Sequence, residues 1–149
     1  NIMLARGMTD VELATDNCVV LKGTLADPYT GKLIEFVRGN KTSSLVQIDH
    51  VVALSDAWQK GAQDLDADTR LQLANDPLEL LAVDGPANQK KGDGDAATWL
   101  PPNKAFRCQY VARQIAVKSK YRLWVTEAEK SAMKRVLSGC GEQVLPLLS

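Results

Sequence analysis

The sequence has few of the residues that build metal sites and disulfide scaffolds. It contains one histidine, and its three cysteines, Cys18, Cys108 and Cys140, include no Cys-x-x-Cys pair. Zinc fingers and His-Glu-x-x-His sites are therefore excluded, because each needs several such ligands close together. Three cysteines are also too few for a disulfide scaffold. They leave open either one disulfide with an unpaired cysteine or three reduced thiols.

Long apolar runs are absent as well. No stretch approaches the roughly 18 apolar residues that a membrane span needs, so no membrane association is expected. No basic and then apolar signal peptide precedes Asn1, and we therefore expect a soluble, already processed segment. The 149 residues are 45% hydrophobic, which is enough to bury one core and predicts a single domain.

The charges balance overall but are unevenly distributed. Eighteen basic and eighteen acidic residues give a net charge of zero, without the strong basic excess typical of a nucleic-acid binder. Residues 41–100 hold five basic and ten acidic residues, whereas residues 101–140 hold nine basic and two acidic ones. The basic segment fits either a surface that contacts a phosphate backbone or a solvated helix face beside an acidic neighbour.

Turn residues and apolar periodicity predict the order of the elements. The turn-forming run at residues 27–31 lies between two β-rich segments and predicts a β-hairpin. Thr126 and Glu129 form a capping box for a last helix, and Gly139 is placed to cap its end. The other expected elements are helices at residues 3–13, 53–60, 66–73 and 103–120, and strands at 45–52 and 78–83.

Four polar residues stand out by their order along the chain. Asp49 and His50 lie at the end of a predicted strand, Asn75 follows 25 positions after His50, and Asn88 follows 13 positions later. Each alone has an ordinary structural explanation, such as a histidine in a strand or an asparagine at a turn or a helix cap. Their combination predicts a shared site.

In this order and spacing the four residues resemble the HNH endonuclease family. The sequence is most similar to the C-terminal HNH domain of GmrSD-type restriction enzymes, in particular to small secreted actinobacterial proteins that carry it. The matching segments are GTLADPYTGK (23–32), IDHVVALSDAW (48–58), NDPLELLAVDGPANQKKGD (75–93), TWLPPN (98–103) and CQYVARQIAVKSKYRL (108–123).

The resemblance implies an α+β fold: a ββα-metal (HNH or His-Me finger) core with an N-terminal β-hairpin and a C-terminal helical hairpin. Residues 1–149 would form one HNH nuclease domain, with the core motif at about 45–95 and the basic helical part at 103–140. Where many family members have a second histidine ligand, this sequence has Asn88, an HNN variant. The amide favours Mg²⁺ or Mn²⁺ over zinc or nickel.

The residue types suit phosphodiester hydrolysis. By resemblance, His50 is the general base, since an unperturbed imidazole has a pKa of about 6.5 and accepts a proton near neutral pH. Asp49 and Asn88 would hold one divalent cation, at a site that can also be empty, and Asn75 would brace the loop and orient the histidine. Substrate contacts are expected from Lys90, Lys91, Arg113 and Lys118, although the lysine pair equally fits a solvated helical turn.

The predicted activity is metal-dependent DNA hydrolysis, and two alternatives stay open. One is a catalytically idle module that binds nucleic acid or a surface partner. The other is a ribonuclease or small phosphodiesterase that uses the same site, because no base-reading module is visible that would separate DNA from RNA. No feature of the sequence indicates an obligate protein partner.

The cysteines support a secreted protein. An antiparallel helical hairpin that turns near residues 123–126 would bring Cys108 and Cys140 together, and we expect a disulfide there. In the family pattern, the position of Cys18 pairs with a cysteine further upstream, so Cys18 is expected to have no partner in this sequence. Three buried reduced thiols in a cytosolic enzyme remain the alternative.

Overall fold

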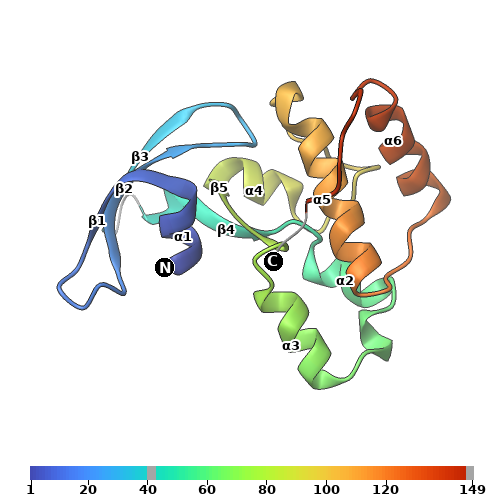
Figure 1. The fold of residues 1–149 in the computed structure, drawn as a ribbon, viewed down its shortest axis with the longest axis horizontal. Coiled ribbons are helices and arrows are strands. Elements are labelled where there is room, and N and C mark those ends of the chain that lie inside the picture. Colours follow the sequence, from blue (N-terminus) through green and yellow to red (C-terminus); the bar gives the residue numbers. More distant parts are fainter. Residues whose placement is uncertain (40–42, 147–149) are drawn as a thin grey trace.

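Figure 1 shows the computed structural model, which describes residues 1–39 and 43–146. As predicted, this part of the chain is of mixed α+β type, with two small antiparallel sheets and helices around them. None of its helices is long and apolar enough to cross a membrane. In chain order the elements are α1 (Ile2–Gly7), β1 (Met8–Leu13), β2 (Val20–Ala26), β3 (Leu33–Val37), β4 (Val46–His50), α2 (Leu54–Gln59), α3 (Ala67–Asn75), β5 (Leu80–Asp84), α4 (Gly85–Lys91), α5 (Arg107–Lys120) and α6 (Glu127–Leu137).

The first sheet contains the predicted β-hairpin. Strands β2 and β3 pair antiparallel around a turn in which the Gly31 amide donates to the Asp27 carbonyl at 2.9 Å. Gly31 has φ +77°, a conformation that glycine adopts without a Cβ clash. The turn is therefore determined by its own residues, Asp27 and Gly31.

The helix predicted over residues 3–13 is wrong in its second half. Helix α1 ends at Gly7, and the chain continues as β1, which pairs antiparallel with β2 and completes a three-stranded sheet in the order β1-β2-β3. A Cβ on Gly7 would lie 3.0 Å from the Ala82 side chain, so the helix ends where it approaches β5 closely. Ladder hydrogen bonds to β2 then replace the weak helical preference of Met8–Leu13.

The second sheet consists of β4 and β5, and α4 follows β5 without a loop. The two strands pair antiparallel from Val46 opposite Asp84 to His50 opposite Leu80. The Asp84 carboxylate caps α4 by accepting from the Ala87 amide at 2.8 Å. A Cβ on Gly85 would lie 2.0 Å from the Ser44 carbonyl oxygen, so only glycine lets α4 begin this close to the start of β4.

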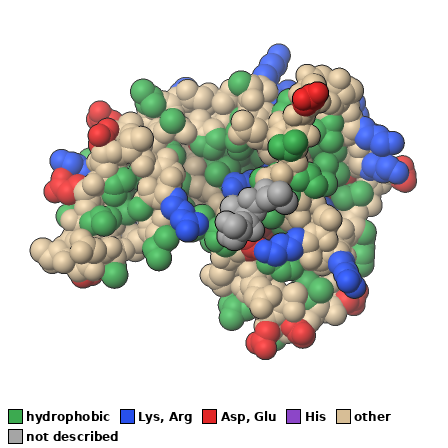
Figure 2. Space-filling view, viewed as in Figure 1, with side chains coloured by type: hydrophobic (Ala, Val, Ile, Leu, Met, Phe, Trp, Pro, Cys, Tyr) green, Lys and Arg blue, Asp and Glu red, His purple; other side chains and the backbone are tan. Residues whose placement is uncertain are grey.

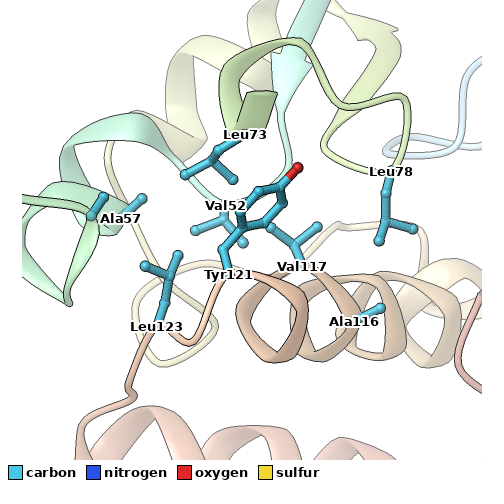
Figure 3. Close-up of a cluster of buried hydrophobic side chains, with 9 residues drawn as sticks. Val52, Ala57, Leu73, Leu78, Ala116, Val117, Tyr121 and Leu123 are labelled. Carbon is cyan, nitrogen blue, oxygen red and sulfur yellow. The ribbon is translucent and has the colours of Figure 1, made fainter. Parts of the chain in front are cut away.

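Buried apolar side chains hold the helices against this sheet. In one cluster, the Tyr121 ring lies among Leu73, Val52 and Val117 and joins α3 and α5 to the segment after β4 (Figure 3). A second cluster contains Tyr29, Trp99 and Tyr110, whose rings pack edge to face at centroid distances of 5.0 to 5.8 Å. The hairpin turn is thereby fixed against the C-terminal half.

The last two helices form the predicted hairpin. Thr126 and Glu129 make the predicted capping box at the start of α6, and a disulfide joins Cys108 in the first turn of α5 to Cys140 beyond α6. The two helices therefore run antiparallel, side by side (Figure 1). Gly139 is not the expected left-handed cap, because helical geometry continues through Ser138 and the positive φ, +60°, occurs at Gly141.

A buried ion-pair network connects α2 with α5 and α6. The Lys60 ammonium contacts Asp56 at 2.5 Å, Asp95 at 2.8 Å and Glu129 at 2.7 Å. Lys118 pairs with Asp56 at 3.1 Å and with Glu129 at 2.7 Å. Burial works to lower the pKa of Lys60, but hydrogen bonds to the three carboxylates outweigh it and raise the pKa above its usual value. The ammonium groups of Lys60 and Lys118 are therefore neutralised by carboxylates inside the fold.

Candidate active site

The two strands and the helix bring the three predicted central residues into one unit. Asp49 and His50 are the last residues of β4, and Asn88 lies in the middle of α4. Helix α4 contacts both β4 and β5. Strands β4 and β5 and helix α4 lie near the middle of the molecule (Figure 1), and Asp49, His50 and Asn88 belong to these elements.

The imidazole of His50 is held in one orientation by the end of α3. Its Nε2 lies 2.9 Å from the carbonyl oxygen of Ala74. A backbone carbonyl only accepts hydrogen bonds, so neutral His50 must carry its proton on Nε2 in this contact. Nδ1 is then the unprotonated nitrogen, with a lone pair that can accept a proton.

Asn75 is the last residue of α3 and follows Ala74 directly. Its side chain is exposed, and its Nδ2 donates to the Leu71 carbonyl at 2.9 Å in the last turn of α3. No hydrogen bond joins the Asn75 side chain to His50 in the described chain. The residue that contacts the imidazole is Ala74, one position earlier.

Asp49 is buried between a tyrosine and a lysine. It is 6% exposed, and its carboxylate accepts a hydrogen bond from the Tyr29 hydroxyl. The Lys91 ammonium lies 3.2 Å from the Asp49 carboxylate and donates to the His50 carbonyl at 2.9 Å. Burial raises the pKa of Asp49, although Lys91, Tyr29 and His50 work in the opposite direction, and burial also raises the pKa of Tyr29 well above its usual value.

Asn88 offers a second oxygen on the same side of the sheet. Its Nδ2 donates to the Gln47 Oε1 at 2.9 Å, and Gln47 and Asp49 point to the same face of β4 because they are two residues apart. No described residue donates a hydrogen bond to the side-chain oxygen of Asn88, Oδ1. A carboxylate oxygen and an amide oxygen are hard donors, the type that Mg²⁺ and Mn²⁺ prefer.

Two protein oxygens fit a cation that keeps most of its ligands from water and phosphate. Within residues 1–39 and 43–146, no three His, Cys, Asp or Glu side chains come together as a fuller metal site. Lys91 would weaken cation binding at this site, because its ammonium already compensates the charge of Asp49. The donor set therefore fits a weakly held hard cation and does not fit a permanent structural metal.

The four predicted substrate contacts have different environments. Lys90 is exposed, but Lys91 and Lys118 are each 3% exposed and pair with internal carboxylates. Their ammonium groups are therefore directed into the fold and bind carboxylates there, in place of the predicted phosphate. Helical geometry explains the difference between the consecutive Lys90 and Lys91, since neighbours on a helix point about 100° apart.

Arg113, the fourth predicted substrate contact, lies in α5 and lines a pocket near β5. Its guanidinium is half-buried, and no described residue makes a hydrogen bond or an ion pair with it. It lines a pocket of about 400 Å³ together with Leu81. Leu81 is directly opposite Asp49 in the sheet, so the two side chains share a face. Burial lowers the pKa of Arg113, although Tyr29, Glu79 and Asp76 work in the opposite direction.

Sequence reasoning missed Tyr29 and Glu79 at this site, and it expected Lys91 to contact substrate where the structure pairs it with Asp49. Tyr29 looked like part of a turn, Lys91 looked like half of a lysine pair, and Glu79 looked like a residue of an apolar strand. Glu79 is fully buried, and its Oε1 accepts from the Val52 amide at 2.5 Å just beyond His50. The helical spacing of Asn88 and Lys91, three residues apart, was the one available signal that both face β4.

Comparison with known proteins agrees with this geometry. The family described as "GmrSD restriction endonucleases, C-terminal domain" matches residues 4–136, so the chain belongs to that family, as the sequence resemblance predicted. An "Uncharacterized secreted protein" from Arthroderma benhamiae is 39% identical over 140 residues, which cover 93% of this chain and 65% of the relative. The chain thus spans slightly less than two thirds of that relative. No solved structure matches the chain.

Proposed function

We propose that this chain is a metal-dependent endonuclease of the HNH type that hydrolyses DNA phosphodiester bonds. The observation that carries the proposal is the contact between His50 Nε2 and the Ala74 carbonyl, because it leaves Nδ1 as a positioned proton acceptor. Membership in a restriction endonuclease family supports the same reaction class. An idle binding module would have no need for a histidine held in one tautomer.

In this proposal His50 accepts a proton at Nδ1 from the attacking water. Arg113 would contact a non-bridging oxygen of the phosphate, because its guanidinium has no described internal partner and lies on the Asp49 side of the sheet. Asn75 would act as a positioning residue that holds the last turn of α3, and with it the Ala74 carbonyl.

Asp49 and Asn88 would hold the divalent cation, which when bound supplies positive charge to the phosphate and the leaving oxygen. Tyr29 and Lys91 would orient the Asp49 carboxylate through their hydrogen bonds to it. Because Lys91 lies beside the same carboxylate, we expect the cation to be bound weakly and to exchange with solvent. Activity should therefore depend on added Mg²⁺ or Mn²⁺ and be lost in EDTA.

We also propose that the protein acts outside the cell. The Cys108–Cys140 disulfide supports this location, because such bonds persist in oxidising compartments. The relative from Arthroderma benhamiae is itself described as secreted.

The decisive experiment is plasmid nicking with Mg²⁺ or Mn²⁺, with RNA tested in parallel. His50→Ala should lower the cleavage rate by about 10²- to 10⁴-fold, the usual contribution of a positioned general base. Gln72→Ala is the matched control, since Gln72 is exposed on α3 and the described hydrogen bond of the His50 ring is to Ala74. Undiminished nicking by folded His50→Ala protein would exclude His50 as the base.

A further inference from the structure

A second concave and positively charged region lies between the two C-terminal helices. It is a pocket of about 790 Å³ between the start of α5, the exposed side of α6 and residues 96–100. Three cations line it: Lys104, Arg107 and Arg135. We refer to it as the Arg107–Arg135 pocket. Figure 2 shows Lys and Arg side chains gathered over the edge of the molecule that α6 forms.

The charge of this pocket is uncompensated. Its lining contains no Asp or Glu, and none of its three cations forms an ion pair within the described residues. The Arg107 Nε donates to the Pro101 carbonyl at 2.8 Å, which fixes the guanidinium and leaves its two Nη groups for another acceptor. A site with three cations and no acid favours an anionic ligand.

The shape of the pocket is fixed before any ligand arrives. The Cys108–Cys140 disulfide joins the residue after Arg107 to the segment beyond α6, so the two arginines on its opposite walls are tied together. The rest of the lining is largely apolar and includes Trp99 and Leu100. An apolar surface with an indole, beside three cations, suits a nucleotide better than a bare inorganic anion.

The pocket is linked to the candidate active site through packed aromatic rings. Trp99 lines the pocket, and its ring packs at 5.0 Å on the ring of Tyr29, whose hydroxyl donates to Asp49. The pocket and Asp49 are therefore connected through one pair of packed rings.

We propose that the Arg107–Arg135 pocket binds a nucleotide that flanks the cleaved bond, with its phosphate at the three cations and its base or sugar on the apolar surface. This inference rests on the proposed nuclease function, which supplies the strand. It adds to that function a second contact point that would set where along the strand the enzyme holds its substrate.

The test measures binding without cleavage. Short fluorescent single strands of DNA and of RNA are titrated with the protein in EDTA, and anisotropy is recorded over a salt series. Lys104→Gln with Arg135→Gln should weaken binding about tenfold and reduce the salt slope by about 1 to 2, since two phosphate contacts are removed. The DNA and RNA arms show which strand the pocket prefers.

The matched control is Lys130→Gln with Lys134→Gln. Both lysines are exposed on α6 and lie outside the pocket, so the pair removes the same charge and should change affinity by less than about twofold. A second variant, Ala128→Trp, fills the pocket from the exposed side of α6 without changing any charge. It should weaken binding as much as the charge variant does, with an unchanged melting temperature.

Equal effects of the two double variants, with no effect of Ala128→Trp, would overturn the pocket and leave only a diffuse electrostatic surface. Failure of the unaltered protein to bind either strand would overturn it as well. If binding behaves as expected but no strand is cleaved with Mg²⁺ or Mn²⁺, the pocket stands and the nuclease proposal fails. If His50-dependent cleavage is found but the pocket variants bind normally, the nuclease proposal stands and the pocket proposal fails.

Discussion

Glu79 makes the free energy of unfolding depend on pH, and one substitution removes this contribution. The residue lies just before β5 and is 0% exposed. Its carbonyl accepts from the Val51 amide at 2.7 Å and its Oε1 from the Val52 amide at 2.5 Å, while Oε2 has no described partner. Burial raises the pKa of Glu79 from 4.5 to about 9, so the folded protein holds this side chain as a neutral acid near neutral pH.

The direction of the effect follows from proton linkage. The folded pKa lies above the unfolded one, so between these values the folded state binds the extra proton and the free energy of unfolding falls as pH rises. The contribution of the protonated acid is complete below about pH 4.5 and is lost as pH rises through 9. Each pH unit in this window corresponds to about 1.4 kcal/mol, which makes about 4 kcal/mol between pH 5 and pH 8.

Glu79→Gln replaces the neutral acid with a neutral amide that keeps the acceptor for Val52. The difference in unfolding free energy between variant and unaltered protein should therefore grow in favour of the variant by about 4 kcal/mol from pH 5 to pH 8. Urea unfolding at several pH values measures it. Glu35→Gln is the control, because Glu35 is exposed on β3 and the substitution makes the same chemical change at the surface. A flat difference for Glu79→Gln would refute the assignment of a buried proton.

Three further predictions concern the cysteines and the last helix. Replacing Cys108 and Cys140 together by serine should lower the free energy of unfolding by about 3 to 4 kcal/mol, since the disulfide closes a loop with a sequence separation of 32; an unchanged urea midpoint would contradict this. Cys18 is free and exposed, so iodoacetamide should label it alone in the folded, non-reduced protein, and mass mapping of any other labelled cysteine would count against the pairing. Thr126→Ala should lower stability by about 1 kcal/mol, read from thermal unfolding, unless the capping box of α6 contributes nothing.

Sequence reasoning succeeded where the information is local. The hairpin turn needs Asp27 and Gly31 in fixed positions, and the start of α6 needs Thr126 and Glu129 three residues apart. Such patterns act within one turn of the chain, so they can be recognised without knowledge of the fold. The disulfide could be predicted because two antiparallel helices with a short connection constrain where their far ends lie.

Sequence reasoning failed where tertiary contacts decide. The residues next to Met8 in the sequence do not indicate that Met8 pairs with β2. The residues next to Lys118 do not indicate that Lys118 forms ion pairs with Asp56 and Glu129. The local sequence predicts a helix at Met8 and a phosphate contact at Lys118. In the fold, partners far away in the sequence determine the strand at Met8 and the ion pairs of Lys118. A basic segment therefore overstates the positive charge available to a phosphate whenever some of its lysines point inward.

The chemical state of His50 belongs to the same class of property, and it matters most for the proposed reaction. An imidazole at the end of β4 has two possible neutral tautomers, and the sequence motif does not distinguish between them. The distinction comes from the Ala74 carbonyl, 24 residues away, whose position depends on how the last turn of α3 ends. The Asn75 side chain bonds within that turn, to Leu71, so the asparagine can influence the histidine through the backbone without touching it. Asn75 therefore makes no direct contact with the proton acceptor of the proposed site. In the proposal, His50 still depends on Asn75, because Asn75 holds the turn that positions the Ala74 carbonyl.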